Sequence, residues 1–88
     1  YKIQINPHSS MTGINMAACV HVLASIDNGG YFEGDVSKNN LFRDELVSTP
    51  YVVDKNGSVL PLEAPGIGVE VNEEFLMKHP VIEGPSYV

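Results

Sequence analysis

A single helix-forming segment, with a short apolar run on each side of it, constrains most strongly what this chain can fold into. Between residues 12 and 25 the inward-facing positions recur every three to four residues, the spacing of one face of an α-helix. These positions are Ile14, Ala17, Ala18, Val20, His21, Leu23 and Ala24. A hydroxyl at Ser10 or Thr12 can cap the first turn. We expect a helix that is mostly buried.

Short extended segments precede and follow this helix. Residues 2–5 alternate polar and apolar side chains, and residues 31–33 are Tyr-Phe-Glu. Between helix and second segment, Asp-Asn-Gly-Gly at residues 27–30 is a strong turn signal, because Asn and Gly tolerate positive φ. Strand, helix, turn and strand in this order predict a βαβ unit of the α/β class, with parallel strands and a right-handed crossover.

Two chemically useful side chains lie where these strands end. His8 follows the first strand and precedes the helix, and Glu33 ends the second strand. Parallel strands end at a common edge, which is where α/β proteins carry ligand-binding and catalytic groups. We therefore expect an imidazole and a carboxyl group to face one space. The plainer interpretations are a surface histidine beside Pro7 and an exposed strand-end carboxylate.

The second half of the chain predicts smaller elements. Residues 36–46 form a possible short helix, with Leu41, Phe42 and Leu46 on one side. Asn56-Gly57 is a strong hairpin signal, so residues 49–53 and 58–62 are expected to pair as two strands. A kinked turn into an extended segment is expected over residues 64–71.

One capped helical turn is expected over residues 72–76. After it comes an irregular tail that contains Pro80, Gly84 and Pro85.

Composition excludes several classes of function. The chain has 88 residues, with 5 Lys+Arg against 11 Asp+Glu and a formal charge of -6, which argues against a nucleic-acid partner. Cys19 is the only cysteine, so neither a disulfide framework nor a thiol metal cluster is expected, and its apolar neighbours predict a buried residue. No apolar run reaches the roughly 20 residues of a membrane span and no secretory leader is evident, so a cytoplasmic location is expected.

The remaining polar candidates have structural explanations. His21 is interpreted as a core histidine with a hydrogen-bond partner, because it lies on the apolar face of the helix. Asp27, Asn28 and Asp35 lie near the same edge as His8, and turn chemistry explains two of them. His8, His21 and His79 lack the compact spacing of a Zn²⁺ site.

Taken in order, the motifs resemble those of a known family. They are Pro7-His8, Ala17-Ala18-Cys19-Val20-His21, Tyr31-Phe32-Glu33, the Asn-Gly turn, and Ala64-Pro65-Gly66-Ile67-Gly68-Val69. Over nearly its whole length the chain resembles the carboxyl-terminal end of the mandelate racemase and muconate lactonizing branch of the enolase superfamily. The resemblance implies the seventh strand, seventh helix and eighth strand of a modified (β/α)8 TIM barrel, and then a terminal hairpin and extended segment that packs on a capping domain.

This resemblance also implies a division of the chain. Residues 1–36 would form the βαβ unit of the barrel and residues 37–88 the terminal barrel and capping segment, with no complete domain. The chain starts at Tyr1, at the edge of an expected strand, which suggests an excerpt. The rest of the barrel and an amino-terminal capping domain would then be its structural partners, in a homo-oligomer.

Roles for individual residues follow from the same resemblance. His8 resembles the family's histidine general acid or base, and the aspartate that orients it would lie on the sixth strand, which this chain lacks. Glu33 resembles the carboxylic acid that hydrogen-bonds to the substrate carboxylate. The family's Mg²⁺ ligands come from the third to fifth strands, so Mg²⁺ is implied with its ligands upstream of Tyr1.

The implied chemistry is removal of the proton next to a carboxylate, from a small carboxylate or acid-sugar substrate. The segment between His8 and the helix is longer than in mandelate racemase and resembles that of the sugar-acid dehydratases, so a dehydratase is the favoured function. A racemase, an epimerase or a lactone-forming cycloisomerase is the alternative. Outside the family, the chain can be interpreted as a non-catalytic α+β binding module with a core of Phe32, Phe42 and Tyr51.

Overall fold

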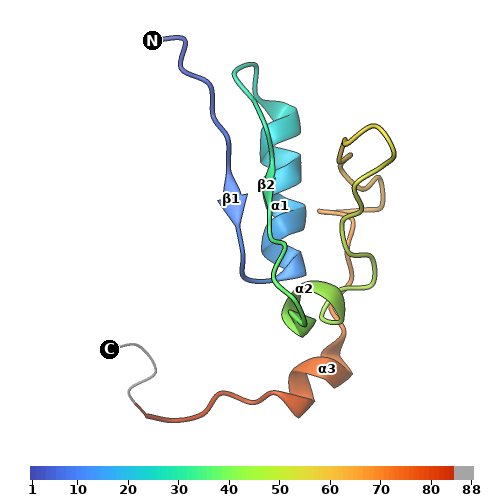
Figure 1. Ribbon diagram of the computed structural model, residues 1–88. Helices are drawn as coiled ribbons and strands as arrows, with labels where there is room; N and C mark the ends of the chain where they lie inside the picture. The colour runs from blue at the N-terminus through green and yellow to red at the C-terminus, as the bar shows by residue number, and fades with distance from the viewer. Residues whose placement is uncertain (85–88) are drawn as a thin grey trace.

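The βαβ unit is the centre of the fold (Figure 1). The computed structural model describes residues 1–84. The elements within that range are β1 (His8–Ser9), α1 (Gly13–Ser25), β2 (Glu33–Gly34), α2 (Leu41–Asp44) and α3 (Glu73–Lys78). The strands β1 and β2 form a two-stranded parallel sheet with α1 as the crossover between them. This confirms the predicted α/β class and the parallel order of the strands.

The two strands are shorter than predicted and are displaced along the chain. The register pairs His8 with Glu33 and Ser9 with Gly34, and Ile5 forms only an isolated parallel bridge to Gly29. The predicted strands at residues 2–5 and 31–33 are therefore wrong in their bounds, and His8 lies within a strand. The backbone ladder is interrupted between the bridge and β1, because the Asn6 side chain accepts the Tyr31 N–H in place of a backbone carbonyl and Pro7 has no N–H.

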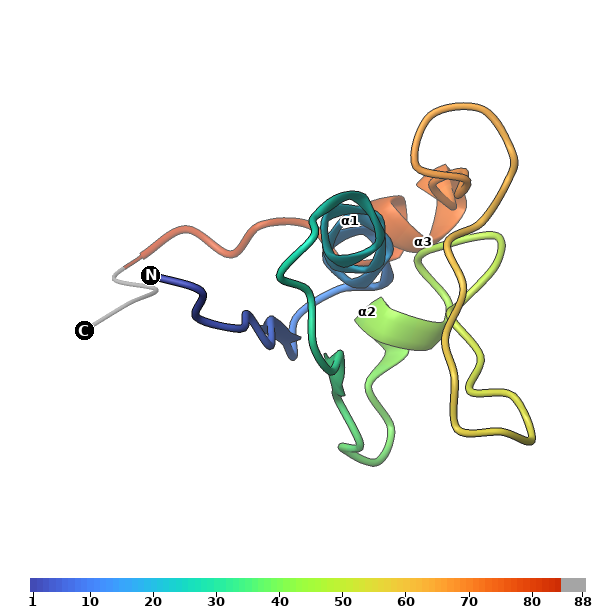
Figure 2. The same ribbon diagram turned by 90° about the horizontal axis from the view of Figure 1, so that it is seen from above.

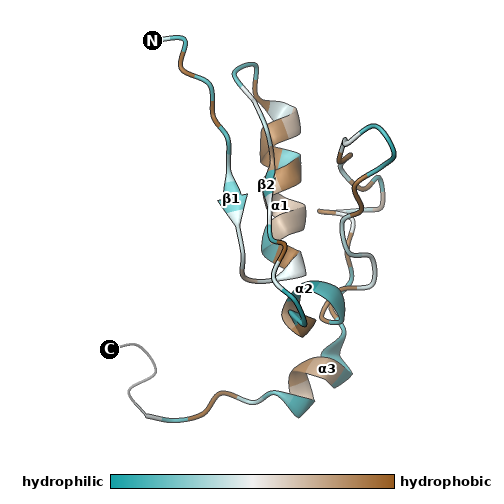
Figure 3. Cartoon of the chain, in the orientation of Figure 1, coloured by the Kyte–Doolittle hydropathy of each residue, from teal (hydrophilic) through white to brown (hydrophobic). Residues whose placement is uncertain are grey.

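The helix α1 begins and ends where the sequence predicts. The Thr12 hydroxyl caps it by accepting a hydrogen bond from the Asn15 backbone N–H (3.1 Å). Its buried residues are Gly13, Met16, Ala17 and Val20. However, Val22 is 55% exposed, so the expectation of a mostly buried helix is wrong for the described chain. Most of α1 is coloured as apolar in Figure 3, although only one side of it is covered.

The helix α2 packs beside the start of α1, as the end-on view of α1 in Figure 2 shows. The contact is close at Gly13, where an added Cβ would lie 2.6 Å from both the Arg43 carbonyl oxygen and Val47 Cγ2. Only glycine allows the two backbones to approach this closely. The short helix predicted within residues 36–46 thus exists, but it is limited to four residues.

The predicted hairpin forms a turn and no strands. The Asp54 N–H donates to the Ser58 carbonyl (2.9 Å), and the Asp54 carboxylate accepts from the N–H groups of Asn56 and Ser58. No strand is formed over residues 49–62, so the predicted two-stranded excursion is wrong. A two-stranded hairpin alone is marginal, and Pro50 and Pro61 supply no ladder donors here.

The last described segments agree with the predictions made from the sequence. Residues 64–71 make the kinked turn, with Gly66 and Gly68 at φ 69° and 84°, and lead to an antiparallel bridge between Val47 and Val71. Asn72 caps α3 by accepting from the Phe75 N–H (3.1 Å). The tail has no regular structure over residues 80–84, and its remaining part, including Pro85, lies outside the described residues.

The apolar core is small. Among residues 1–84 six apolar residues are buried, namely Met16, Ala17, Val20, Leu46, Val47 and Phe75. Phe75 also packs edge-to-face on Phe42, with ring centroids 5.2 Å apart, whereas Phe32 packs separately on Tyr51 at 5.3 Å. The single aromatic core of Phe32, Phe42 and Tyr51 that a binding module would need is therefore not present. Large apolar side chains such as Ile3 (70% exposed) and Met77 (82% exposed) face solvent.

We expect the isolated 88-residue chain to melt over a broad temperature range, because so small a core cannot support a cooperative transition. Circular dichroism, together with binding of a dye specific for exposed apolar surface, measures this. A sharp transition without dye binding would instead show a self-sufficient module.

Candidate functional site

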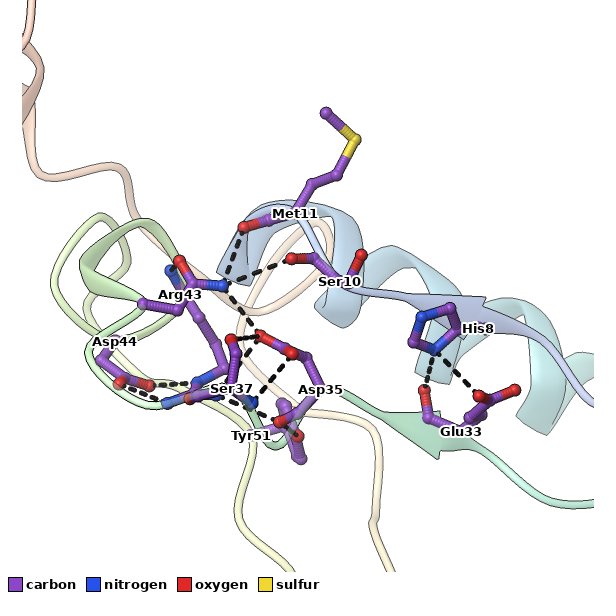
Figure 4. Close-up of polar contacts among 10 residues, drawn as sticks. His8, Ser10, Met11, Glu33, Asp35, Ser37, Arg43, Asp44 and Tyr51 are labelled. Carbon is purple, nitrogen blue, oxygen red and sulfur yellow. Dashed lines mark hydrogen bonds and ion pairs between the residues drawn. The ribbon is translucent and has the colours of Figure 1, made fainter.

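The side chains of His8 and Glu33 lie side by side on the two strands. The parallel register places the two residues opposite each other. The Nδ1 atom of His8 is 2.9 Å from the Glu33 backbone carbonyl oxygen and 3.7 Å from Glu33 Oε1, as Figure 4 shows. The two side chains are 46% and 68% exposed. The structure thus brings together the two residues that the sequence selects for the site, and their chemical roles stay predictions.

The hydrogen bond to the backbone determines which nitrogen of His8 carries the proton. A carbonyl oxygen only accepts hydrogen bonds, so Nδ1 of His8 must be the donor in the 2.9 Å contact with Glu33. In the neutral ring, the lone pair that can accept a proton is then on Nε2. A histidine held in this tautomer is suited to act as a base through Nε2.

The end of β1 is fixed by α1. Ser9 is the residue after His8 and is only 3% exposed. Its hydroxyl oxygen accepts a hydrogen bond from the Asn15 side-chain amide (2.6 Å), which lies in the first turns of the helix. A buried hydroxyl with a partner on a helix limits movement of the strand. Only the polar character of Asn15 points to this contact in the sequence.

A polar network follows β2, and we call it the Asp35 network (Figure 4). It consists of Asp35, Ser37, Asn40, Arg43, Asp44 and Tyr51. At its centre, the Asp35 carboxylate accepts hydrogen bonds from Ser37, from the Asn40 amide (2.9 Å) and from Arg43 (3.3 Å). Its side chain is only 8% exposed.

These contacts shift the pKa values of the charged members. The hydrogen bond from Asn40, followed by those from Ser37, lowers the pKa of Asp35 from 3.8 to about 2. The hydrogen bond between Arg43 and Asp44 lowers the pKa of Asp44 and raises that of Arg43. All three groups are charged at neutral pH. The Asp35 network is therefore a fixed arrangement of charges.

Sequence reasoning missed most of this network. It places Asp35 near the same edge as His8 but gives it no role, although the carboxylate accepts hydrogen bonds from both the backbone N–H and the hydroxyl of Ser37. Asn40, Arg43 and Tyr51 were not selected. One usable signal was the scarcity of basic residues, because Arg43 is one of only 5 Lys+Arg in the chain.

The other two histidines each form a hydrogen bond to a backbone carbonyl. Nε2 of His21 lies 3.0 Å from the Ile67 carbonyl oxygen and therefore donates to it. His21 is thus a structural residue with a hydrogen-bond partner, although it is half-buried. Nδ1 of His79 donates to the Phe75 carbonyl at 2.9 Å, and the two rings stack with centroids 4.3 Å apart. Cys19 was predicted to be buried and is only half-buried, because α1 is covered on one side.

Residues 1–84 do not form a metal site by themselves. Within this range no three His, Cys, Asp or Glu side chains come together closely enough to hold an ion. His8 and Glu33 alone would offer two ligand groups, fewer than the several oxygen ligands that a hard divalent cation takes from its surroundings. No helix in the described part of the chain is long and apolar enough to cross a bilayer.

Comparisons with known proteins agree on one family. The family model described as "Enolase C-terminal domain-like" matches residues 1–75. The o-succinylbenzoate synthase of Bacillus subtilis (strain 168) is 37% identical over 68 residues, which cover 77% of this chain and 18% of that protein. A D-galactonate dehydratase of Xanthomonas campestris pv. campestris (strain B100) is 31% identical over 84 residues, which cover 89% of this chain and 22% of that protein.

A solved structure has the same fold. The crystal structure of a member of the enolase superfamily from Polaromonas sp. JS666 matches with a TM-score of 0.86 and 49% sequence identity. The match covers 100% of this chain and 23% of that chain. The chain thus spans about a fifth of the length of the proteins that it matches.

We expect Asp35 to titrate with a midpoint near pH 2 in the folded protein, followed by carbon-13 NMR of its carboxyl carbon. Because its pKa is lower folded than unfolded, its contribution to the free energy of unfolding is complete above about pH 4 and is lost as the pH falls toward 2. The Asp35→Asn variant should lack this part of the acid dependence. A midpoint near the ordinary 3.8 would show that the network does not form.

Proposed function

The chain belongs to the enolase superfamily, and on that premise we propose that it is part of an enzyme that removes the proton next to a carboxylate, most specifically a sugar-acid dehydratase. Its membership confirms the resemblance drawn from the sequence motifs. The observation that supports the proposal most directly is the pairing of His8 and Glu33 on neighbouring parallel strands.

The reaction needs a base and a means of stabilising negative charge. A proton on the carbon next to a carboxylate is weakly acidic, and its loss leaves an enediolate. Positioned acid or base groups contribute about 10²–10⁴ in rate to such steps. His8, with its lone pair on Nε2, supplies the base under this proposal.

Dehydration uses the same imidazole twice. Nε2 of His8 accepts the α-proton, and the C–H bonding electrons form the carbon–carbon double bond of the enediolate. The imidazolium then donates this proton to the hydroxyl on the neighbouring carbon; the enediolate electrons shift to form a double bond between the two carbons and restore the carboxylate, and the C–O bond breaks to release water. The proton taken from carbon leaves in that water, and His8 returns to its neutral form with Nδ1 still bonded to Glu33.

Glu33 has a separate role. Its carboxyl group is 3.7 Å from His8, longer than a hydrogen bond, and is 68% exposed, so it is available to a substrate. When it carries its proton, the carboxyl donates a hydrogen bond to an oxygen of the substrate carboxylate as charge develops there. In this proposal β1 and β2 are the seventh and eighth strands of the barrel.

The proposal includes Mg²⁺ as the cofactor of the complete enzyme. In this superfamily one or two Mg²⁺ ions stabilise the enediolate. As the family resemblance implies, the Mg²⁺ ligands would come from the third to fifth strands of the barrel, and the steps above involve only residues of this chain. The small acid-sugar substrate, the capping domain, the homo-oligomer and the cytoplasmic location remain predictions.

The substrate's structure separates the alternatives within the superfamily. A hydroxyl on the carbon next to the acidic carbon permits dehydration, whereas return of the proton to carbon gives racemisation or epimerisation. D-galactonate is the first substrate to test, since several relatives at 30–32% identity are D-galactonate dehydratases. An isomerase or cycloisomerase is the second candidate. A non-catalytic module is disfavoured by the small, divided core.

In the complete enzyme, we expect His8→Asn to abolish turnover with folding unchanged, and Glu33→Gln to slow it by a factor of about 10² or more, because the amide is a poorer donor to the developing charge. The assay measures the 2-oxo acid that forms when the dehydrated enol tautomerises, and proton NMR in D2O detects isomerisation. His79→Asn is the matched control and should retain activity. Near-wild-type activity of either site variant would remove that residue from the mechanism.

A further inference from the structure

We propose that Asn40 is a positioning residue that fixes the separation of His8 and Glu33 by joining the chain just after β1 to the chain just after β2. This inference rests on the proposed function. The argument starts from where the backbone pairing between the strands ends. Ser9 and Gly34 are the last pair in the register. Beyond them the two segments turn toward different helices, α1 and α2.

Asn40 makes the connection that the backbone does not. Its side-chain Nδ2 lies 3.3 Å from the carbonyl oxygens of both Ser10 and Met11, directly after β1. The same nitrogen lies 2.9 Å from the Asp35 carboxylate, directly after β2. An amide nitrogen carries only two hydrogens, so the two carbonyls share one of them and the carboxylate takes the other. One side chain thus links both strand ends.

Asp35 is itself held in place, so the link has a fixed end. Arg43 donates both to the Asp35 backbone carbonyl (3.1 Å) and to its carboxylate (3.3 Å). The Tyr51 hydroxyl donates to the same carbonyl at 3.1 Å. With the bonds from Ser37, this leaves little freedom for the chain that follows Glu33. Loss of the Asn40 contacts therefore loosens the backbone of Ser10 and Met11 more than that of Asp35, although Ser9 keeps its bond to Asn15.

The separation of the strands matters directly for the reacting groups. The bond that fixes the tautomer of His8 crosses from β1 to the Glu33 carbonyl on β2. If the strand ends separate, that bond lengthens and the lone pair is no longer confined to Nε2. A misplacement of about 1 Å at a reacting group can cost about 10² in rate. Asn40 does not touch the reacting groups, so its effect would be exerted through His8 and Glu33.

The competing explanation is that Asn40 only caps α2. Its Oδ1 accepts from the Arg43 backbone N–H at 3.2 Å, which is the contact of an N-cap. Asn72 offers a matched comparison at α3, where Oδ1 accepts from the Phe75 N–H (3.1 Å) and Nδ2 donates to the Glu45 carbonyl (3.2 Å). An Asn→Asp change keeps the cap at either position and removes the donor, but only at Asn40 does the donor join the two strands.

The test compares Asn40→Asp and Asn72→Asp in the complete enzyme. A third variant, Asn40→Ser, adds no charge and keeps a capping oxygen, but its side chain is too short to reach Ser10 and Met11. We expect both changes at Asn40 to lower kcat about 10-fold to 100-fold while KM stays within about threefold. Asn72→Asp should match the wild type. Nitrogen-15 NMR of the His8 ring should show a mixture of tautomers in the Asn40 variants and the Nδ1-protonated tautomer in the others.

Two results would overturn the inference: a wild-type kcat in both Asn40 variants, or a loss of activity that only follows a loss of folded protein while the ring nitrogens of His8 are unchanged. The Asn40→Ser variant covers the case in which Asn40→Asp fails to fold because its new carboxylate faces that of Asp35. The His8→Asn variant distinguishes failure of the inference about Asn40 from failure of the proposed function. If His8→Asn keeps full activity, the proposed role of His8 as the base falls, whereas the NMR signature of His8 in the Asn40 variants still tests the positioning role of Asn40.

Discussion

The register between β1 and β2 is the constraint on which the site depends. Side chains alternate between the faces of a strand, so a slip of one residue would turn either His8 or Glu33 to the other face. Two contacts besides the strand pairs oppose such a slip. The Glu33 N–H donates to the Pro7 carbonyl (3.0 Å), and the Ile5 to Gly29 bridge fixes the other end of the pairing. The length of α1 then determines which residues meet after the crossover.

Polar contacts hold the end of the sheet that carries the site, where the apolar core is thin. The buried apolar side chains are Met16, Ala17 and Val20 of α1 together with Leu46, Val47 and Phe75. At the strand ends, by contrast, the Asp35 carboxylate is 8% exposed and paired with Arg43. Hydrogen-bonded charges define distances and angles more narrowly than apolar packing does. Such an arrangement suits a region that, under the proposed function, positions two reacting groups.

Local signals in the sequence were enough to predict the helix, its cap and the edge of the site. Thr12 caps α1 through a contact three residues along the chain, and the turn at Asp27-Asn28 returns the chain for a second parallel strand. The predicted strand boundaries were wrong because the Asn6 side chain and Pro7 interrupt the backbone hydrogen bonds between the strands. Neither effect can be predicted from the alternation of polar and apolar side chains. The Asp35 network was missed because it joins residues 35–43 to Ser10, Met11 and Tyr51, which only the tertiary fold brings together.

The exposure of His8 and Glu33 indicates that the proposed chemistry needs surrounding residues from outside the described part of the chain to exclude water. His8 and Glu33 are 46% and 68% exposed, whereas stabilisation of an enediolate relies on donors in a site from which water is excluded. A sheet of two strands also has an unpaired outer edge on each strand, and such edges are normally paired or covered. Exposed apolar side chains along the same segment, Ile3 at 70% and Ile5 at 46%, offer a surface for a neighbouring strand. Under the proposed function, the arrangement of His8 and Glu33 would therefore become catalytic only when further strands enclose it.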